Sequence, residues 1–172
     1  MAMVSKGRSV RPVLKVQWSA LHIIMIVFGV IGLAVMIGAL FLYWHELPAQ
    51  IPTHFGFSGE ADAWGDKISL VYLTLVSAGL FVMMVVLSRF PNIYNFPVNI
   101  TEENAEVQYR LAMNMVLVLG AAIVWLFVYI FLQMIRVALG QVPGLGSGFL
   151  AVILLIMFIP IGYFFMAMRG AA

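Results

Sequence analysis

Four long apolar segments constrain this chain more than any other feature of its sequence. They cover residues 18–44, 68–87, 111–139 and 149–168, and each is long enough to cross a bilayer as a helix. Only 9% of the residues are charged, against about 25% in an average soluble domain. None of the segments alternates in polarity as a barrel strand would. The sequence therefore predicts an all-α fold over residues 1–172, a single membrane domain in a lipid bilayer. We expect an integral membrane four-helix bundle with a structured outer loop between the first two helices.

The lysines and arginines predict the orientation of this bundle, because such residues gather in cytoplasmic loops. With the N-terminus inside the cell, seven basic residues lie in the cytoplasm and two outside. The seven are Lys6, Arg8, Arg11, Lys15, Arg89, Arg110 and Arg169, and the two are Lys67 and Arg136. We therefore expect cytoplasmic N- and C-termini, an outer loop over residues 45–67 and a cytoplasmic loop over residues 88–110.

Net charge and cysteine content exclude several function classes. A net charge of +2 is too small to suggest a nucleic-acid partner. The chain has no cysteine, so it has no disulfide, no thiolate metal site and no cysteine nucleophile. No cofactor is predicted, and the sequence leaves the oligomeric state open.

The cytoplasmic loop contains signals for the start of the third helix. Thr101 has the character of an N-cap, which predicts a helix from near Glu102. Glu106 and Arg110 are four residues apart and are expected to form an ion pair on that helix. The loop between the third and fourth spans, "GQVPGLGSG", is uncharged and glycine-rich and predicts a tight turn.

Small residues inside the spans predict where helices approach each other closely. The first span has a series of them, Gly29, Gly32, Ala34 and Gly38, and Gly79 and Gly120 lie in later spans. In membranes, small residues let helix backbones come close enough to pack, so we expect these positions at helix contacts.

Four polar or ionisable residues fall within the spans: His22, Asn114, Gln133 and Arg136. His22 and Asn114 lie at the same depth, so they are expected to hydrogen-bond across helices. Gln133 and Arg136 lie one helical turn apart near the outer end of the third span. Arg136 is expected either to extend toward water or to pair with an acid of the outer loop.

The outer loop, residues 45–67, includes the stretch "LPAQIPTHFGFSGEADAWGDK" and contains the candidate ligands for a metal ion. His45, His54, Glu60 and Asp62 supply nitrogen and oxygen donors that zinc accepts. Their spacing matches no recognised metal motif. A metal-dependent membrane enzyme that uses His54 and the loop acids is therefore an alternative hypothesis, and no catalytic residue is assigned.

The same loop can also be interpreted as a compact cap over the helix ends. In this interpretation Pro48 and Pro52 stiffen the chain, Lys67 anchors the second span, and aromatic residues fill the top of the bundle. These aromatic residues are Phe55, Phe57 and Trp64. Aromatic residues ringed by acids would equally suit a recognition surface for a partner or toxin.

The loop resembles the signature of a bacterial membrane family called domain of unknown function 1648. The matching residues are Pro48, Pro52, His54, Phe55, Gly59, Gly65 and Lys67, and Gly56 stands where the family commonly has asparagine. The stretch "NFPVNITEENAEVQYRLA", residues 95–112, also resembles the family. This family is best known through an immunity protein against a sporulation-delay toxin. The resemblance implies a bacterial inner-membrane location and the predicted topology, and it provides no catalytic residues.

These observations favour a non-enzymatic binding role that acts through the outer loop: immunity-like, sensory, or as an accessory subunit of a larger membrane complex with a protein partner. Asp62 and the residues that carry the resemblance are the candidate binding positions. A small-solute transporter is a further alternative, but it requires a polar path that four sparse intramembrane polar residues do not supply.

Overall fold

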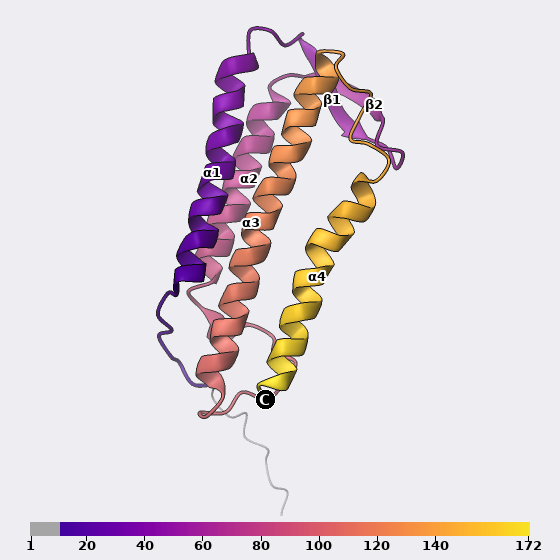
Figure 1. The fold of residues 1–172 in the computed structure, drawn as a ribbon. Helices are drawn as coiled ribbons and strands as arrows, with labels where there is room; N and C mark the ends of the chain where they lie inside the picture. The colour runs from indigo at the N-terminus through magenta and orange to yellow at the C-terminus, as the bar shows by residue number, and fades with distance from the viewer. Residues whose placement is uncertain (1–10) are drawn as a thin grey trace, which may run out of the picture.

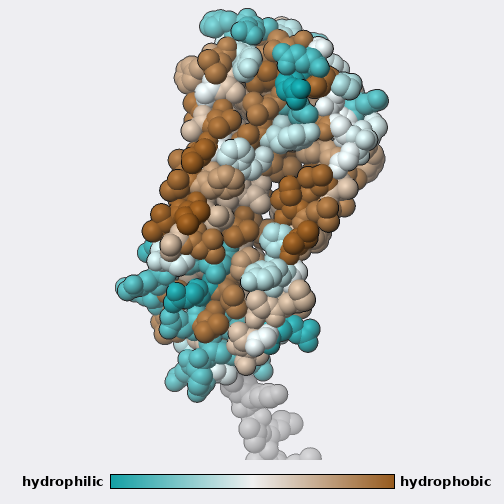
Figure 2. Space-filling view, viewed as in Figure 1, coloured by the Kyte–Doolittle hydropathy of each residue, from teal (hydrophilic) through white to brown (hydrophobic). Residues whose placement is uncertain are grey.

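The computed structural model describes residues 11–172 and contains the four expected helices with a small β-hairpin. The helices are α1 (Ala20–Tyr43), α2 (Ser69–Leu87), α3 (Ala105–Ala138) and α4 (Phe149–Gly170). All four are long and apolar enough to cross a membrane. On the face shown in Figure 2, hydrophobic residues form a broad band across the middle of the molecule, with hydrophilic residues toward both ends. The predicted four-helix membrane bundle is confirmed. Lys6 and Arg8, two of the basic residues used to predict the orientation, lie outside the described residues.

The centre of the bundle is α3, which contacts α1, α2, α4 and the hairpin. Its buried residues recur along one side and continue into the apolar core. In contrast, α4 buries only Phe164 and Met168. Figure 1 shows α4 (yellow) close to α3 near the C-terminus and further from it toward the hairpin. The three-helix core of α1, α2 and α3 is therefore well packed, and α4 contributes most of its surface to lipid.

Glycines in α1 determine how closely α1 approaches its neighbours, as the sequence predicted. Gly29 lies against the ring of Phe81 in α2, and Gly32 lies against Val124 in α3. A side chain at either position would overlap these neighbours. Gly120 is also in close contact, with Met84 of α2.

The prediction is wrong for the other small residues. Ala34 is exposed, and Gly38 and Gly79 have nothing within 4 Å of the position that a Cβ would take. The physical reason is that a helix presents different faces at different positions, and these residues point to the lipid rather than to a partner helix.

The outer loop is structured, as expected, and it forms two β-strands that were not predicted. Strands β1 (Gln50–Phe55) and β2 (Ala61–Asp66) pair antiparallel, with Pro52 opposite Trp64 and an irregular register between Pro52 and Phe55. We call these two strands and residues 56–60 between them the hairpin. Gly59 closes the turn with φ of +83°, a conformation that glycine adopts without steric cost.

The start of α3 differs from the prediction by three residues. The helix begins at Ala105 with Asn104 as N-cap, not at Glu102 after Thr101. The hydroxyl of Thr101 accepts the backbone N–H of Asn104 at 3.3 Å, and the side chain of Asn104 accepts the N–H of Thr101 at 2.9 Å. This reciprocal pair forms a turn before the helix. The predicted ion pair between Glu106 and Arg110 is confirmed, at 2.7 Å.

Candidate functional site

The hairpin is attached to the bundle at two places, and the first is Lys67. Its ammonium group donates to the carbonyl oxygens of Trp44 at 2.9 Å and Leu47 at 3.3 Å. It also lies 4.8 Å from the centre of the Trp44 ring. A helix C-terminus leaves carbonyl groups without partners and favours a positive charge. Lys67 thus ties the end of the hairpin to the end of α1, whereas the sequence analysis assigned it to the second span.

The second attachment joins the hairpin to the loop between α3 and α4. The backbone N–H of Leu145 donates to the carbonyl of Gly59 at 2.7 Å, and Glu60 pairs with Gly144 as an isolated bridge. A Cβ on Gly59 would lie 2.7 Å from the carbonyl oxygen of Gly146. The glycine-rich segment is therefore more than the tight turn predicted, because its glycines let two backbones meet. The uncharged, glycine-rich composition of this segment was the only available signal for this contact.

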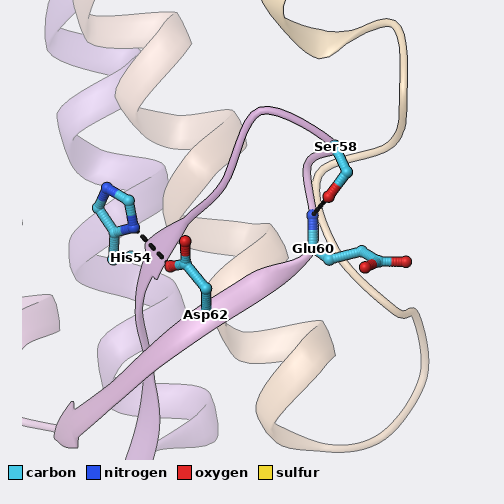
Figure 3. Close-up of polar contacts among 4 residues, drawn as sticks. All are labelled: His54, Ser58, Glu60 and Asp62. Carbon is cyan, nitrogen blue, oxygen red and sulfur yellow. Dashed lines mark hydrogen bonds and ion pairs between the residues drawn. The ribbon is translucent and has the colours of Figure 1, made fainter.

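His54 and Asp62 come together on the hairpin. Nδ1 of His54 lies 2.5 Å from Oδ1 of Asp62, and both side chains are more than half exposed. Figure 3 shows these two side chains pointing toward each other across the strands, while the carboxylate of Glu60 points away. The antiparallel pairing of β1 with β2 places His54 opposite Ala63, next to Asp62.

The third ligand that the metal hypothesis needs does not join this pair. Within residues 11–172, no three His, Asp or Glu side chains lie close enough together to hold one metal ion. His45 lies exposed in the turn after α1, and Glu60 is directed elsewhere. The described residues therefore bring two of the four candidate ligands together.

A pocket of about 410 Å³ lies beside the His54–Asp62 pair. Its walls come from the hairpin, from the loop between α3 and α4, and from the first turns of α4. The contributing residues include His54, Asp62, Phe57, Leu145, Phe149 and Ile153. A second, largely apolar pocket of about 440 Å³ between α3 and α4 shares Leu145, Gly146 and Phe149 with it. Polar hairpin groups thus face an apolar groove where α4 separates from α3.

The aromatic residues of the hairpin are not in the positions that the cap interpretation predicted. Phe55 is partly buried against the core, but Phe57 is 94% exposed and Trp64 is 51% exposed. The prediction that all three fill the top of the bundle is wrong for Phe57 and Trp64. Instead Leu47 and Ile51 belong to the buried core that includes residues of α3, and Pro52 is also buried.

The remaining motif residues support the hairpin backbone. Pro48 lies exposed in the connection from α1 to β1, and Pro52 is buried within β1. Gly65 lies opposite Ile51, and a Cβ there would come within 3.0 Å of the side chain of Thr53. The conformation and packing of the hairpin backbone are therefore sufficient to account for Pro48, Pro52 and Gly65.

The intramembrane polar residues form two separate groups. Nε2 of His22 lies 2.7 Å from Oδ1 of Asn114, which confirms the predicted contact between α1 and α3. Nδ1 of His22 accepts the backbone N–H of Ser19 at 3.1 Å, so both ring nitrogens of this buried side chain have partners. The pair lies at the end of the bundle opposite the hairpin and stabilises packing there.

Gln133 and Arg136 belong to a chain of hydrogen bonds on α3. Arg136 donates to Gln133 at 3.1 Å, Gln133 donates to the hydroxyl of Tyr129 at 3.0 Å, and Tyr129 donates to the carbonyl of Leu145 at 2.8 Å. Arg136 is exposed, and within residues 11–172 it forms no ion pair with an outer-loop acid. This chain also holds the α3–α4 loop against α3, beside the Gly59 contact.

Residues 23–78 match the family described as domain of unknown function (DUF1648). The chain carries a DUF1648 domain. The DUF1648 domain covers most of α1, the whole hairpin and the start of α2, including the loop signature identified in the sequence. Residues 95–112, the second stretch that resembled the family, lie outside the matched part. Searches of curated proteins and of solved structures found no match. The relation to the immunity protein stays a prediction.

Proposed function

We propose that this protein is a non-enzymatic membrane protein that binds a protein partner through the hairpin of its DUF1648 domain. The observation that carries the proposal is the 94% exposure of Phe57 at the tip of the hairpin. Trp64 is also half exposed, and Glu60 and Asp62 lie nearby in the sequence and on the hairpin. Aromatic side chains beside polar groups are typical of the residues that dominate binding energy at protein interfaces.

The attachment of the hairpin supports this role. Lys67 and the Gly59–Leu145 contact hold the hairpin to two different parts of the bundle. A surface that is already ordered loses less conformational entropy on binding than a flexible loop. An immunity-like, sensory or accessory-subunit role would each use such a surface, and none requires a catalytic group.

Replacement of Phe57 by alanine tests the proposal directly. A partner that co-purifies with the wild-type protein in mild detergent is expected to be about 10-fold or more less abundant with Phe57→Ala. A loss of this size is typical of a residue that dominates the binding energy of an interface. Phe41→Ala is the matched control, because Phe41 is 81% exposed on α1 and does not belong to the hairpin. Quantitative mass spectrometry of the purified complexes gives the ratio. Absence of any wild-type partner, or equal depletion by both variants, would contradict the proposal.

The proposal places the hairpin outside the bacterial inner membrane, with both termini in the cytoplasm. The bias of lysine and arginine supports this orientation. Because the chain has no cysteine, single introduced cysteines report accessibility without background. In intact cells, a membrane-impermeant maleimide is expected to label Ser58→Cys, and to label Asn104→Cys only after the cells are opened. The reverse pattern would show that the bundle is inverted.

A further inference from the structure

The N-terminal segment before α1 lies in a defined position at the end of the bundle opposite the hairpin. The guanidinium of Arg11 donates to the carbonyls of Asn92 and Tyr94, and it lies 5.7 Å from the centre of the Phe96 ring. The hydroxyl of Tyr109 donates to the carbonyl of Pro12 at 2.8 Å. These contacts hold the segment against the α2–α3 connection and the start of α3.

A pocket of about 750 Å³ lies between this segment, the end of α2 and Met113 of α3. It combines two basic residues, Lys15 and Arg89, with aromatic and apolar residues that include Trp18 and Phe90. The guanidinium carbon of Arg89 lies 4.8 Å from the centre of the Trp18 ring, which orients this side chain. The pocket is therefore basic on part of its wall and apolar on the rest.

No acidic residue lines this pocket. Glu106 lines a neighbouring pocket that Lys15 also borders, and its carboxylate is bound to Arg110 at 2.7 Å. Within residues 11–172, the ion pairs are His54–Asp62 and Glu106–Arg110, and neither includes Lys15 or Arg89. Residues 1–10 contain no aspartate or glutamate that could compensate them. Two positive charges thus share one pocket without an acidic partner from the chain, and an anion there would relieve their repulsion.

The depth of the pocket identifies the kind of anion. It lies where α1 begins and α2 ends, with Trp18 just before the first helical residue and Arg89 just after the last turn of α2. The hydrocarbon layer ends at this level, and lipid phosphates and interfacial tryptophans occupy it. We propose that the pocket binds the phosphate headgroup of an anionic membrane lipid. Lys15 and Arg89 contact the phosphate, and Trp18 and Phe90 contact the adjoining apolar part of the lipid.

The test measures binding of fluorescent phosphatidylglycerol to the delipidated full chain in detergent. Phosphatidylcholine, which is zwitterionic and has no net charge, is the comparison. Arg89→Gln and Lys15→Gln are each expected to weaken phosphatidylglycerol binding about 5-fold, and together about 20-fold or more, from the attraction of one basic residue to anionic lipid. Arg89→Lys keeps the charge and is expected to retain most of the binding. Arg169→Gln is the matched control, because Arg169 lies at the same end of the bundle but outside the pocket.

Three outcomes would overturn the proposal. Equal affinity for both lipids would show that charge is not recognised, and an equal loss in Arg169→Gln would show general attraction to a basic surface. Competition by inorganic phosphate as effective as competition by unlabelled phosphatidylglycerol would show a site for a small anion rather than for a lipid. Thermal unfolding of each variant in the same detergent accompanies the titrations. If Arg89→Gln does not fold, Lys15→Gln and Arg89→Lys still decide between these results.

Discussion

Replacing Gly59 with alanine is expected to release the hairpin from the α3–α4 loop. A non-glycine residue at φ of +83° costs about 1–2 kcal/mol. The new Cβ would also lie 2.7 Å from the carbonyl oxygen of Gly146 and would push the two backbones apart. We expect a total loss of about 3 kcal/mol of docking free energy, a change on the order of 100-fold in the local opening equilibrium.

Hydrogen exchange measures this opening directly, because the amide of Leu145 donates to the carbonyl of Gly59. The peptide that contains Leu145 should exchange faster in Gly59→Ala than in the wild type. Gly140→Ala is the matched control: Gly140 has φ of +69°, but nothing lies within 4 Å of the position of its Cβ. It carries the backbone strain without the steric clash. Equal exchange in the two variants would mean that the Gly59–Gly146 contact does not hold the hairpin.

Replacing Gly29 with alanine is expected to destabilise the helix bundle itself. The added Cβ would overlap the ring of Phe81, which is buried and also lies 3.6 Å from the position of a Cβ on Gly120 of α3. The ring therefore has no free space to enter, and α1 must move away from α2. Overpacking of this kind costs about 1–3 kcal/mol, and we expect the upper part of that range.

Thermal or SDS-induced unfolding of the detergent-solubilised protein measures this loss. Gly38→Ala is the control on the same helix, because nothing lies within 4 Å of the position of its Cβ. It should be neutral or slightly stabilising, since alanine favours helix over glycine. Phe81→Leu makes room and should restore part of the stability lost in Gly29→Ala, as a positive coupling in a double-mutant cycle. Equal stability of Gly29→Ala and Gly38→Ala would show that the close approach of α1 and α2 does not contribute to the stability of the bundle.

The parts of the site that could be predicted from sequence depend on local signals. Glu106 and Arg110 pair because four residues separate them on one helix, and His22 and Asn114 pair because they lie at the same depth in neighbouring spans. The hairpin was missed because β1 and β2 contain proline, glycine and charged residues and no clear alternation. The pairing of these strands brings His54 next to Asp62, so the contact could not be predicted while the hairpin was missed.

The sequence by itself determined that the chain spans a membrane four times, because apolar segments of this length are stable only in lipid and only as helices. It also located the family signature within the DUF1648 domain. Only the tertiary structure decided that Lys67 binds the end of α1, that Gly59 meets the α3–α4 loop, and that Phe57 is exposed. The two contacts join residues that are distant in sequence, and both use backbone carbonyl groups, which every residue type has. Their partners therefore leave little trace in the order of the amino acids.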